Sequence, residues 1–216
     1  MVIQKAGGFC FKLSAGPVTV AVNPPSARST HKISKFGSGI VLVSLPHEDW
    51  NGVETATHGE KAPFVISGPG AYEVGDVNIA GYASPASYGD VISDVGNTMY
   101  TIDMDGIRVL ILGATSSSKI PADIREELDG IGIVLVPVGE GALDAKGAHE
   151  LATSLEPNVI IPYAVGDLSA RSTQAGEKGI AAFLKAEGET GLKATDKFTV
   201  RAKELAAMDG DVVLLA

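Results

Sequence analysis

One short segment near the start of the chain reads Ser44-Leu45-Pro46-His47-Glu48-Asp49-Trp50-Asn51-Gly52. It begins at the end of an apolar run, residues 40–44, which predicts a short buried strand. A histidine and a carboxylate, His47 and Asp49, therefore come directly after the end of a strand. Both are side chains of the kind that bind metal ions. Trp50, the only tryptophan of the chain, lies beside them.

Composition limits the class of protein. The chain has 216 residues, 45% of them hydrophobic, which suits one domain over residues 1–216. The formal net charge is −9, and without clustered Lys and Arg we expect no nucleic-acid binding. No apolar run approaches the ~20 residues of a membrane span. Nothing resembles a secretory signal, so the sequence predicts a cytoplasmic protein that is not inserted in a membrane.

Short apolar runs alternate with turn residues along the first half of the chain, and helices alternate with strands later. We expect strands at residues 9–13, 18–22, 40–44, 64–66, 77–82, 98–103, 107–112, 131–138, 159–163, 198–201 and 212–215. We expect a turn over residues 67–75 and helices at residues 121–128, 144–155 and 176–185. The dipeptide Asp105-Gly106 between two β-rich runs predicts a tight hairpin turn. Residues 131–138 are nearly all apolar, as in a strand buried on both faces.

Residues 45–50 resemble the metal-binding motif His-x-His-x-Asp-His of the metallo-β-lactamase superfamily, with Leu45 at the first histidine and Trp50 at the last. Further segments are similar, in the same order, to a branch of small bacterial hydrolases that includes ascorbate-6-phosphate lactonase. They are Gly7-Gly8-Phe9-Cys10-Phe11, Val22-Asn23-Pro24, Gly68-Pro69-Gly70-Ala71-Tyr72-Glu73-Val74-Gly75, Asn97-Thr98-Met99-Tyr100, Leu112-Gly113-Ala114 and Glu156-Pro157-Asn158-Val159-Ile160-Ile161-Pro162-Tyr163-Ala164. The resemblance implies an α/β fold, the αββα sandwich of two mixed β-sheets flanked by helices.

The resemblance also implies a site between the sheets, where family hydrolases hold one or two Zn²⁺, Mn²⁺ or Fe ions. These ions activate a water that attacks an ester, lactone, amide or phosphodiester. Of the family ligands, His47 and Asp49 remain. Leu45, Trp50, Ala114 and Ala164 stand where ligands belong, and residues 81–90, where another histidine belongs, contain none. Zinc sites need at least three protein ligands. We therefore expect a degenerate metal site and no metal cofactor; Zn or Mn would be the ion if that expectation fails.

Each surviving polar residue also has an ordinary structural explanation. His47 is either a remaining ligand or a hydrogen-bonded loop residue, and we favour the second. Asp49 is either a general base or a structural residue that caps a helix beginning near Asn51 or Gly52 or stabilises the loop, and we favour capping or loop stabilisation. Trp50 either fills the former site or is an exposed contact residue; its large apolar surface favours filling. His31, His58 and His149 have no ligand-like spacing.

Two functions remain open. The first is a metallo-β-lactamase-fold protein that has lost metal-dependent hydrolysis and binds a small molecule or a protein, or has a structural role. The second is a hydrolase of a small ester, lactone or phosphoester, with a remodelled mononuclear or metal-free site that uses His47 and Asp49. The resemblance also leaves a homo-oligomer open. A packed apolar plug at Leu45 and Trp50 would favour the first function, and an open polar cleft the second.

Overall fold

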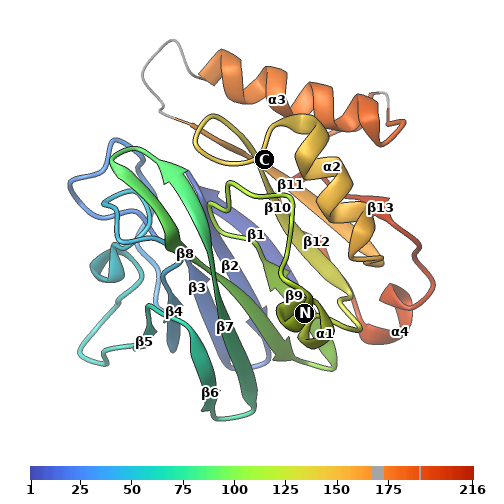
Figure 1. The fold of residues 1–216 in the computed structure, drawn as a ribbon. Coiled ribbons are helices and arrows are strands. Elements are labelled where there is room, and N and C mark those ends of the chain that lie inside the picture. Colours follow the sequence, from blue (N-terminus) through green and yellow to red (C-terminus); the bar gives the residue numbers. More distant parts are fainter. Residues whose placement is uncertain (167–172, 190) are drawn as a thin grey trace.

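Two β-sheets packed face to face form the body of the protein (Figure 1). The computed structural model describes residues 1–166, 173–189 and 191–216. Both sheets contain parallel and antiparallel pairs. The predicted sandwich of two mixed sheets is therefore confirmed.

The first sheet has the order β12-β1-β2-β3-β4-β5. Its strands are β1 (Val2–Gly7), β2 (Cys10–Ala15), β3 (Val18–Val22), β4 (Ile40–Leu42), β5 (Phe64–Ile66) and β12 (Phe198–Thr199). Strands β1, β2 and β3 are antiparallel neighbours, whereas β4 runs parallel to β3 and to β5. The loop that follows β4 carries His47, Asp49 and Trp50.

The second sheet has the order β13-β11-β10-β9-β8-β7-β6. Its strands are β6 (Gly70–Val74), β7 (Val77–Tyr88), β8 (Val91–Met104), β9 (Ile107–Ile111), β10 (Ile133–Gly139), β11 (Val159–Val165) and β13 (Asp211–Val212). Strands β6 to β9 form an antiparallel meander. Strands β9, β10, β11 and β13 are parallel, and helical crossovers connect β9 to β10 and β10 to β11.

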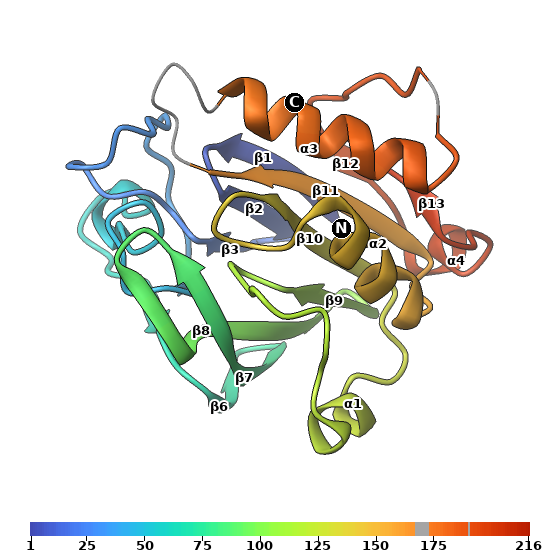
Figure 2. The same ribbon diagram turned by 45° about the horizontal axis from the view of Figure 1, so that its top comes forward.

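Helices α2 (Ala145–Ser154) and α3 (Thr173–Ala186) pack on each other and on the outer side of β10 and β11 (Figure 2). The remaining helices are short: α1 (Ala122–Glu127), α4 (Ala202–Leu205) and the 3-10 turn η1 (Val53–Thr55). On the outer side of the first sheet, Phe36, Val53 and Ala56 pack against the strands. Within the described part of the chain, no helix is both long enough and apolar enough to cross a membrane.

Strand β10 is buried on both faces, as its apolar run predicts. Ile133 and Leu135 point into the core between the sheets, whereas Val134 and Val136 contact the layer under the helices. Successive side chains of a strand point to opposite faces, so one continuous apolar run serves two cores. The helix predicted at residues 144–155 is also confirmed, and the Asp144 side chain caps it by accepting a hydrogen bond from the Gly147 backbone N–H at 2.7 Å.

The hairpin turn at Asp105-Gly106 is present, with φ of 58° and 71° at the two residues. The turn predicted over residues 67–75 is wrong in part, because Gly70–Val74 forms the edge strand β6, paired with β7. Strands β7 and β8 extend well beyond the runs that predicted them. Their added residues are rich in Ser, Gly and Asp and resemble a loop, but they pair with each other across the hairpin.

Candidate functional site

Backbone hydrogen bonds to both sheets fix the loop that follows β4. The backbone N–H of Val43 donates to the Ile66 carbonyl at 2.9 Å, and that of Ser44 donates to Asn23 Oδ1 at 2.8 Å. The Ser44 carbonyl accepts from the backbone N–H of Thr98 in the second sheet, also at 2.8 Å. The strand that delivers His47 and Asp49 is therefore anchored across the sandwich immediately before the loop begins.

A buried polar network then joins strands β7, β8 and β11 of the second sheet to the segment that follows β9. The side chain of Asn97 donates to Ser84 Oγ and to the Leu112 carbonyl, and accepts from the backbone N–H of Ala114 at 2.8 Å. The Tyr163 hydroxyl donates to the Gly113 carbonyl. Burial raises the pKa of Tyr163 well above its usual range, so this hydroxyl stays protonated as a donor. These bonds bring together segments that the sequence alone leaves far apart.

An aromatic cluster occupies the space beside the loop. Trp50 is fully buried and stacks on Phe9 at 4.5 Å between ring centroids. Tyr88 meets both rings edge-on, at 5.5 Å from Trp50 and 5.6 Å from Phe9. Such offset-stacked and edge-to-face contacts are the favoured aromatic geometries. Trp50 is thus packed as a core residue, in agreement with the predicted filling.

The other predicted site positions do not all lie in this core. Leu45 and Ala114 are fully buried and share the core between the sheets with Trp50. Ala164 lies on β11, paired with Val138 of β10, and is only half-buried. Three of the four replaced positions therefore belong to one apolar core.

The carboxylate of Asp49 lies at the edge of the aromatic cluster, where it accepts two hydrogen bonds and lies near two imidazoles. The Ser29 hydroxyl donates to Oδ1 and the Tyr88 hydroxyl donates to Oδ2, the latter at 2.7 Å. The imidazoles of His47 and His31 approach Oδ2 at 3.5 Å and 4.0 Å. Of the two structural roles expected for Asp49, helix capping is wrong, because the 3-10 turn η1 begins at Val53 and has no side-chain cap. The hydroxyl hydrogen bonds agree with the other role, stabilisation of the loop.

His47 is part of its own loop. Its Nδ1 accepts the backbone N–H of Asp49 at 3.2 Å, which places the proton of the neutral ring on Nε2. A Cβ at Gly89 would lie 3.2 Å from this Nε2, so the glycine leaves room for the ring. The histidine stands edge-on to Tyr88 at 5.1 Å between ring centroids. The expected hydrogen-bonded loop role of His47 matches this arrangement.

The residues present do not fit a dinuclear metal centre. Across residues 1–166, 173–189 and 191–216, no cluster of three or more His, Cys, Asp or Glu side chains is arranged to hold a metal ion. The nitrogen of His47 nearest Asp49 accepts a backbone hydrogen bond, and both Asp49 oxygens accept hydroxyl hydrogen bonds. Leu45 and Ala114 have no atom that ligates metal. The site consists of mostly buried, hydrogen-bonded polar groups at the edge of an apolar cluster.

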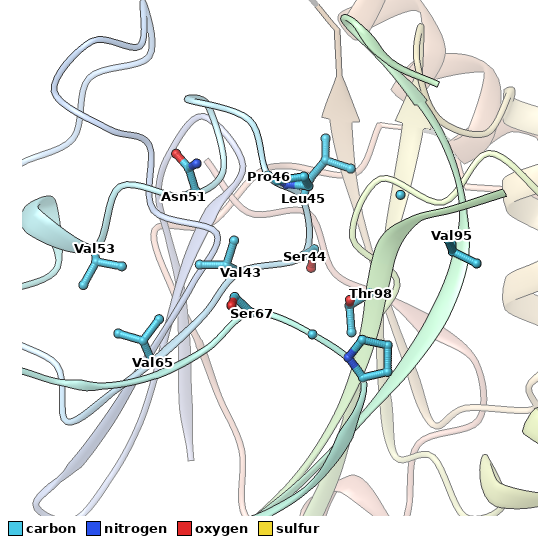
Figure 3. A pocket seen from close by; sticks show the side chains of 13 residues that line it. Val43, Ser44, Leu45, Pro46, Asn51, Val53, Val65, Ser67, Val95 and Thr98 are labelled. Carbon is cyan, nitrogen blue, oxygen red and sulfur yellow. The ribbon is translucent and has the colours of Figure 1, made fainter. Parts of the chain in front are cut away.

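A pocket of about 460 Å³ opens beside the loop, on the side of β5 and β8 (Figure 3). Leu45 and Pro46 form one wall, Val65 and Ser67 another, and Val95 lies opposite. Leu45 lines this pocket and also belongs to the core between the sheets that contains Trp50. No residue pattern predicted it, because its walls come from four separate segments.

Three side chains near Asp49 were missed from the sequence: Ser29, His31 and Tyr88. Spacing gave no reason to join His31 to residues 47–49, yet the fold places its ring against Phe9 at 4.5 Å and beside Asp49. Tyr88 lies in the histidine-free stretch where a family ligand was expected. The sequence signal that could have placed Tyr88 near the site is the glycine that follows it. Gly89 has a φ of 59° and lies in the turn between β7 and β8.

The fold and the loop after β4 define a metallo-β-lactamase-like sandwich. A family model described as a beta-lactamase superfamily domain matches residues 2–164, which is more than half of the chain. The chain therefore belongs to the metallo-β-lactamase superfamily.

Solved structures support the same fold over nearly the full chain. A Thermotoga maritima protein described as a Zn-dependent hydrolase of this superfamily is 26% identical, with a TM-score of 0.74, and the match covers 99% of this chain and 97% of that one. A protein described as a metal-dependent hydrolase from Parabacteroides distasonis is 18% identical, with a TM-score of 0.62 and coverage of 98% and 91%. An isothiocyanate hydrolase from Delia radicum gut bacteria is 10% identical, with a TM-score of 0.64 and coverage of 94% and 100%. The last two likenesses concern the fold alone.

Two curated relatives carry another name. S-adenosylmethionine synthases from Salinispora tropica and Salinispora arenicola are 30% and 29% identical over 129 residues, or 54% of this chain. The match covers 32% of each synthase, so the chain spans about a third of the length of these relatives.

Proposed function

We propose that this protein has lost the dinuclear centre of its superfamily and acts as a non-catalytic binding or structural module. The packing of Trp50 carries the proposal. Trp50 stands where the resemblance places a family ligand, and its ring is fully buried and stacks on Phe9. An apolar core at this place avoids the cost of burying charged ligands without their ions, which is several kcal/mol for each charge.

The arrangement of the surviving polar pair supports the same proposal. Asp49 binds two hydroxyls, and His47 binds the backbone of its own loop. Binding an ion here would break these hydrogen bonds, and leaving a buried polar group unpaired costs about 1–3 kcal/mol. Both side chains are therefore used in holding the loop on the sandwich.

Metal analysis tests this proposal directly. The protein is produced with added zinc and manganese, purified without chelator and analysed by mass spectrometry for metal. We expect well below one ion per chain and an unchanged melting temperature in EDTA. Stoichiometric metal, together with metal-dependent hydrolysis of a generic ester, lactone or phosphodiester, would refute the loss of the centre.

A variant with restored ligands provides the matched control. The four changes Leu45→His, Trp50→His, Ala114→Asp and Ala164→His return ligand-type side chains to the replaced positions. If this variant folds by circular dichroism and takes up metal while the native chain does not, the replaced residues account for the difference. If both chains take up metal equally, the proposal is wrong.

A second candidate is a metal-free hydrolase. One observation favours it: two imidazoles and a tyrosine hydroxyl converge on one carboxylate, Asp49. General acid–base catalysis uses side chains of these types. In that case His47→Ala and Asp49→Ala would each abolish hydrolysis in a chain that remains folded. Equal hydrolysis by the native chain and both variants would exclude this candidate.

A further inference from the structure

The pocket beside Leu45 has a lining without formal charge. It is lined by 13 residues, and none of them is Asp, Glu, Lys, Arg or His. Its volume of about 460 Å³ lies within the range of small-molecule sites, roughly 300–1,000 Å³. An ionised ligand would lose its hydration here without gaining a counter-charge, which is unfavourable by several kcal/mol.

The charge of the whole chain strengthens this argument for anions. The net charge is −9, so the surrounding field repels phosphorylated or carboxylated molecules. Cations would be drawn to the protein in general, but this pocket offers no carboxylate to hold them. The chemistry of the lining therefore selects an uncharged ligand.

The polar side chains of the lining are uncharged and belong to four residues, Ser44, Asn51, Ser67 and Thr98. Figure 3 shows Ser44, Ser67 and Thr98 around the middle of the pocket, with Val43, Val53 and Val65 to one side. The Ser44 hydroxyl is buried, and in the described part of the chain it has no hydrogen-bond partner. This oxygen is buried against Gly113, so the polar side chains of the lining that are open to a ligand are those of Asn51 and Ser67.

Two exposed valines lie at the mouth of the pocket. Val65 on β5 is 43% exposed, and Val95 on the β7–β8 hairpin is 71% exposed. Both side chains line the same pocket from opposite sheets. Apolar side chains grouped at an opening commonly mark a ligand-binding groove.

We propose that this pocket binds an uncharged small organic molecule that has an apolar body and one hydrogen-bonding group. The apolar body lies between Val65 and Val95, and the hydrogen-bonding group faces the exposed polar side chains of the lining, Asn51 and Ser67. This assignment names a ligand class for the proposed binding role, and it rests on that role.

Two dyes that share one skeleton test the ligand class. N-phenyl-1-naphthylamine is uncharged at neutral pH, and 1-anilinonaphthalene-8-sulfonate adds one sulfonate to the same rings. Titrations of the full chain followed by dye fluorescence should show saturable binding of the uncharged dye, at least about tenfold tighter than binding of the sulfonate. Equal affinities, or no binding of the uncharged dye, would overturn the proposal.

Substitutions assign the binding to this pocket. Val65→Lys places a charge at the mouth, on an edge strand where lysine is well tolerated. We expect the uncharged dye to bind about tenfold more weakly and the sulfonate to bind more tightly. Ile92→Lys is the matched control, because Ile92 is 79% exposed on the neighbouring hairpin but does not line the pocket.

Each result has a defined meaning. Weaker binding in Val65→Lys with no change in Ile92→Lys supports the pocket, whereas parallel behaviour of the two variants overturns it. If Val65→Lys does not fold, Ser67→Lys, at an exposed loop residue of the same lining, replaces it. Metal content separates the two proposals. If the chain is free of metal and does not bind the dye, only the proposed ligand class is rejected. If the chain contains stoichiometric metal, only the proposed loss of the metal centre is rejected.

Discussion

Replacing Trp50 by alanine should destabilise the protein by about 2–4 kcal/mol. Truncating a buried tryptophan costs about 3–5 kcal/mol through lost transfer energy and the cavity left behind. Trp50 is fully buried and makes ring contacts with Phe9 and Tyr88. In the described residues its Nε1 has no hydrogen-bond partner, so its removal returns about 1 kcal/mol.

Trp50→Phe separates the packing of the ring from its polar atom. Phenylalanine keeps a ring on Phe9 and removes the unpaired Nε1–H. The lost ring atoms cost about 2 kcal/mol of burial, and removing the unpaired donor offsets about 1–3 kcal/mol of that. We therefore expect Trp50→Phe to stay within about 1 kcal/mol of the native chain.

Urea unfolding followed by far-UV circular dichroism measures both variants without a tryptophan signal. With an m-value of about 3 kcal/mol/M, the midpoint of Trp50→Ala should fall by roughly 1 M. Ile92→Ala, at a side chain that is 79% exposed, is the control and should shift by less than about 0.5 kcal/mol. A loss below about 1 kcal/mol in Trp50→Ala would refute the packed role of this ring.

Three further predictions concern the surrounding structure. Gly113→Ala should cost several kcal/mol more stability than Gly130→Ala. Both glycines have positive φ, but a Cβ at Gly113 would lie 2.3 Å from a side-chain oxygen, whereas Gly130 faces open space. Similar urea midpoints for the two variants would show that Gly113 is not sterically restricted. Asp49→Asn should lose about 2 kcal/mol of stability, because its charge-assisted hydrogen bonds become weaker. The control Glu48→Gln, at an exposed side chain, should lose less than about 0.5 kcal/mol, and equal losses in urea unfolding would show that the Asp49 contacts do not hold the loop. Burial raises the pKa of Tyr163, so the contribution of this hydroxyl to the free energy of unfolding is fully present below the unfolded pKa of 10.0 and falls above it by about 1.4 kcal/mol per pH unit. Tyr163→Phe should therefore flatten the decline of the urea midpoint at alkaline pH, and an unchanged slope would contradict this.

Much of the fold could be predicted from local pattern. The run at β10 predicted a strand buried on both faces, and Asp105-Gly106 predicted the tight hairpin turn. Strand pairing beyond such signals was harder to predict. The outer ends of β7 and β8 have the composition of a loop, and they become strands because each supplies the other's backbone hydrogen bonds.

The candidate site was predictable in its residue types and less so in its contacts. The buried state of Leu45 and Trp50 followed from their apolar character. The partners of Asp49 did not follow, because Ser29 and Tyr88 are 20 and 39 positions away along the chain. A local rule favoured helix capping for this carboxylate, and two long-range hydroxyl donors use it instead.

The sequence by itself determined the superfamily, the main strands and the absence of ligating atoms at Leu45, Trp50, Ala114 and Ala164, because these depend on residue identity and short-range periodicity. The tertiary structure decided which side chains meet. It brought His31 and Tyr88 to Asp49 and formed an uncharged pocket next to Leu45 from segments of both sheets. Such contacts depend on how the two sheets pack on each other. The number of residues between two side chains along the sequence does not determine how far apart they lie in the folded protein.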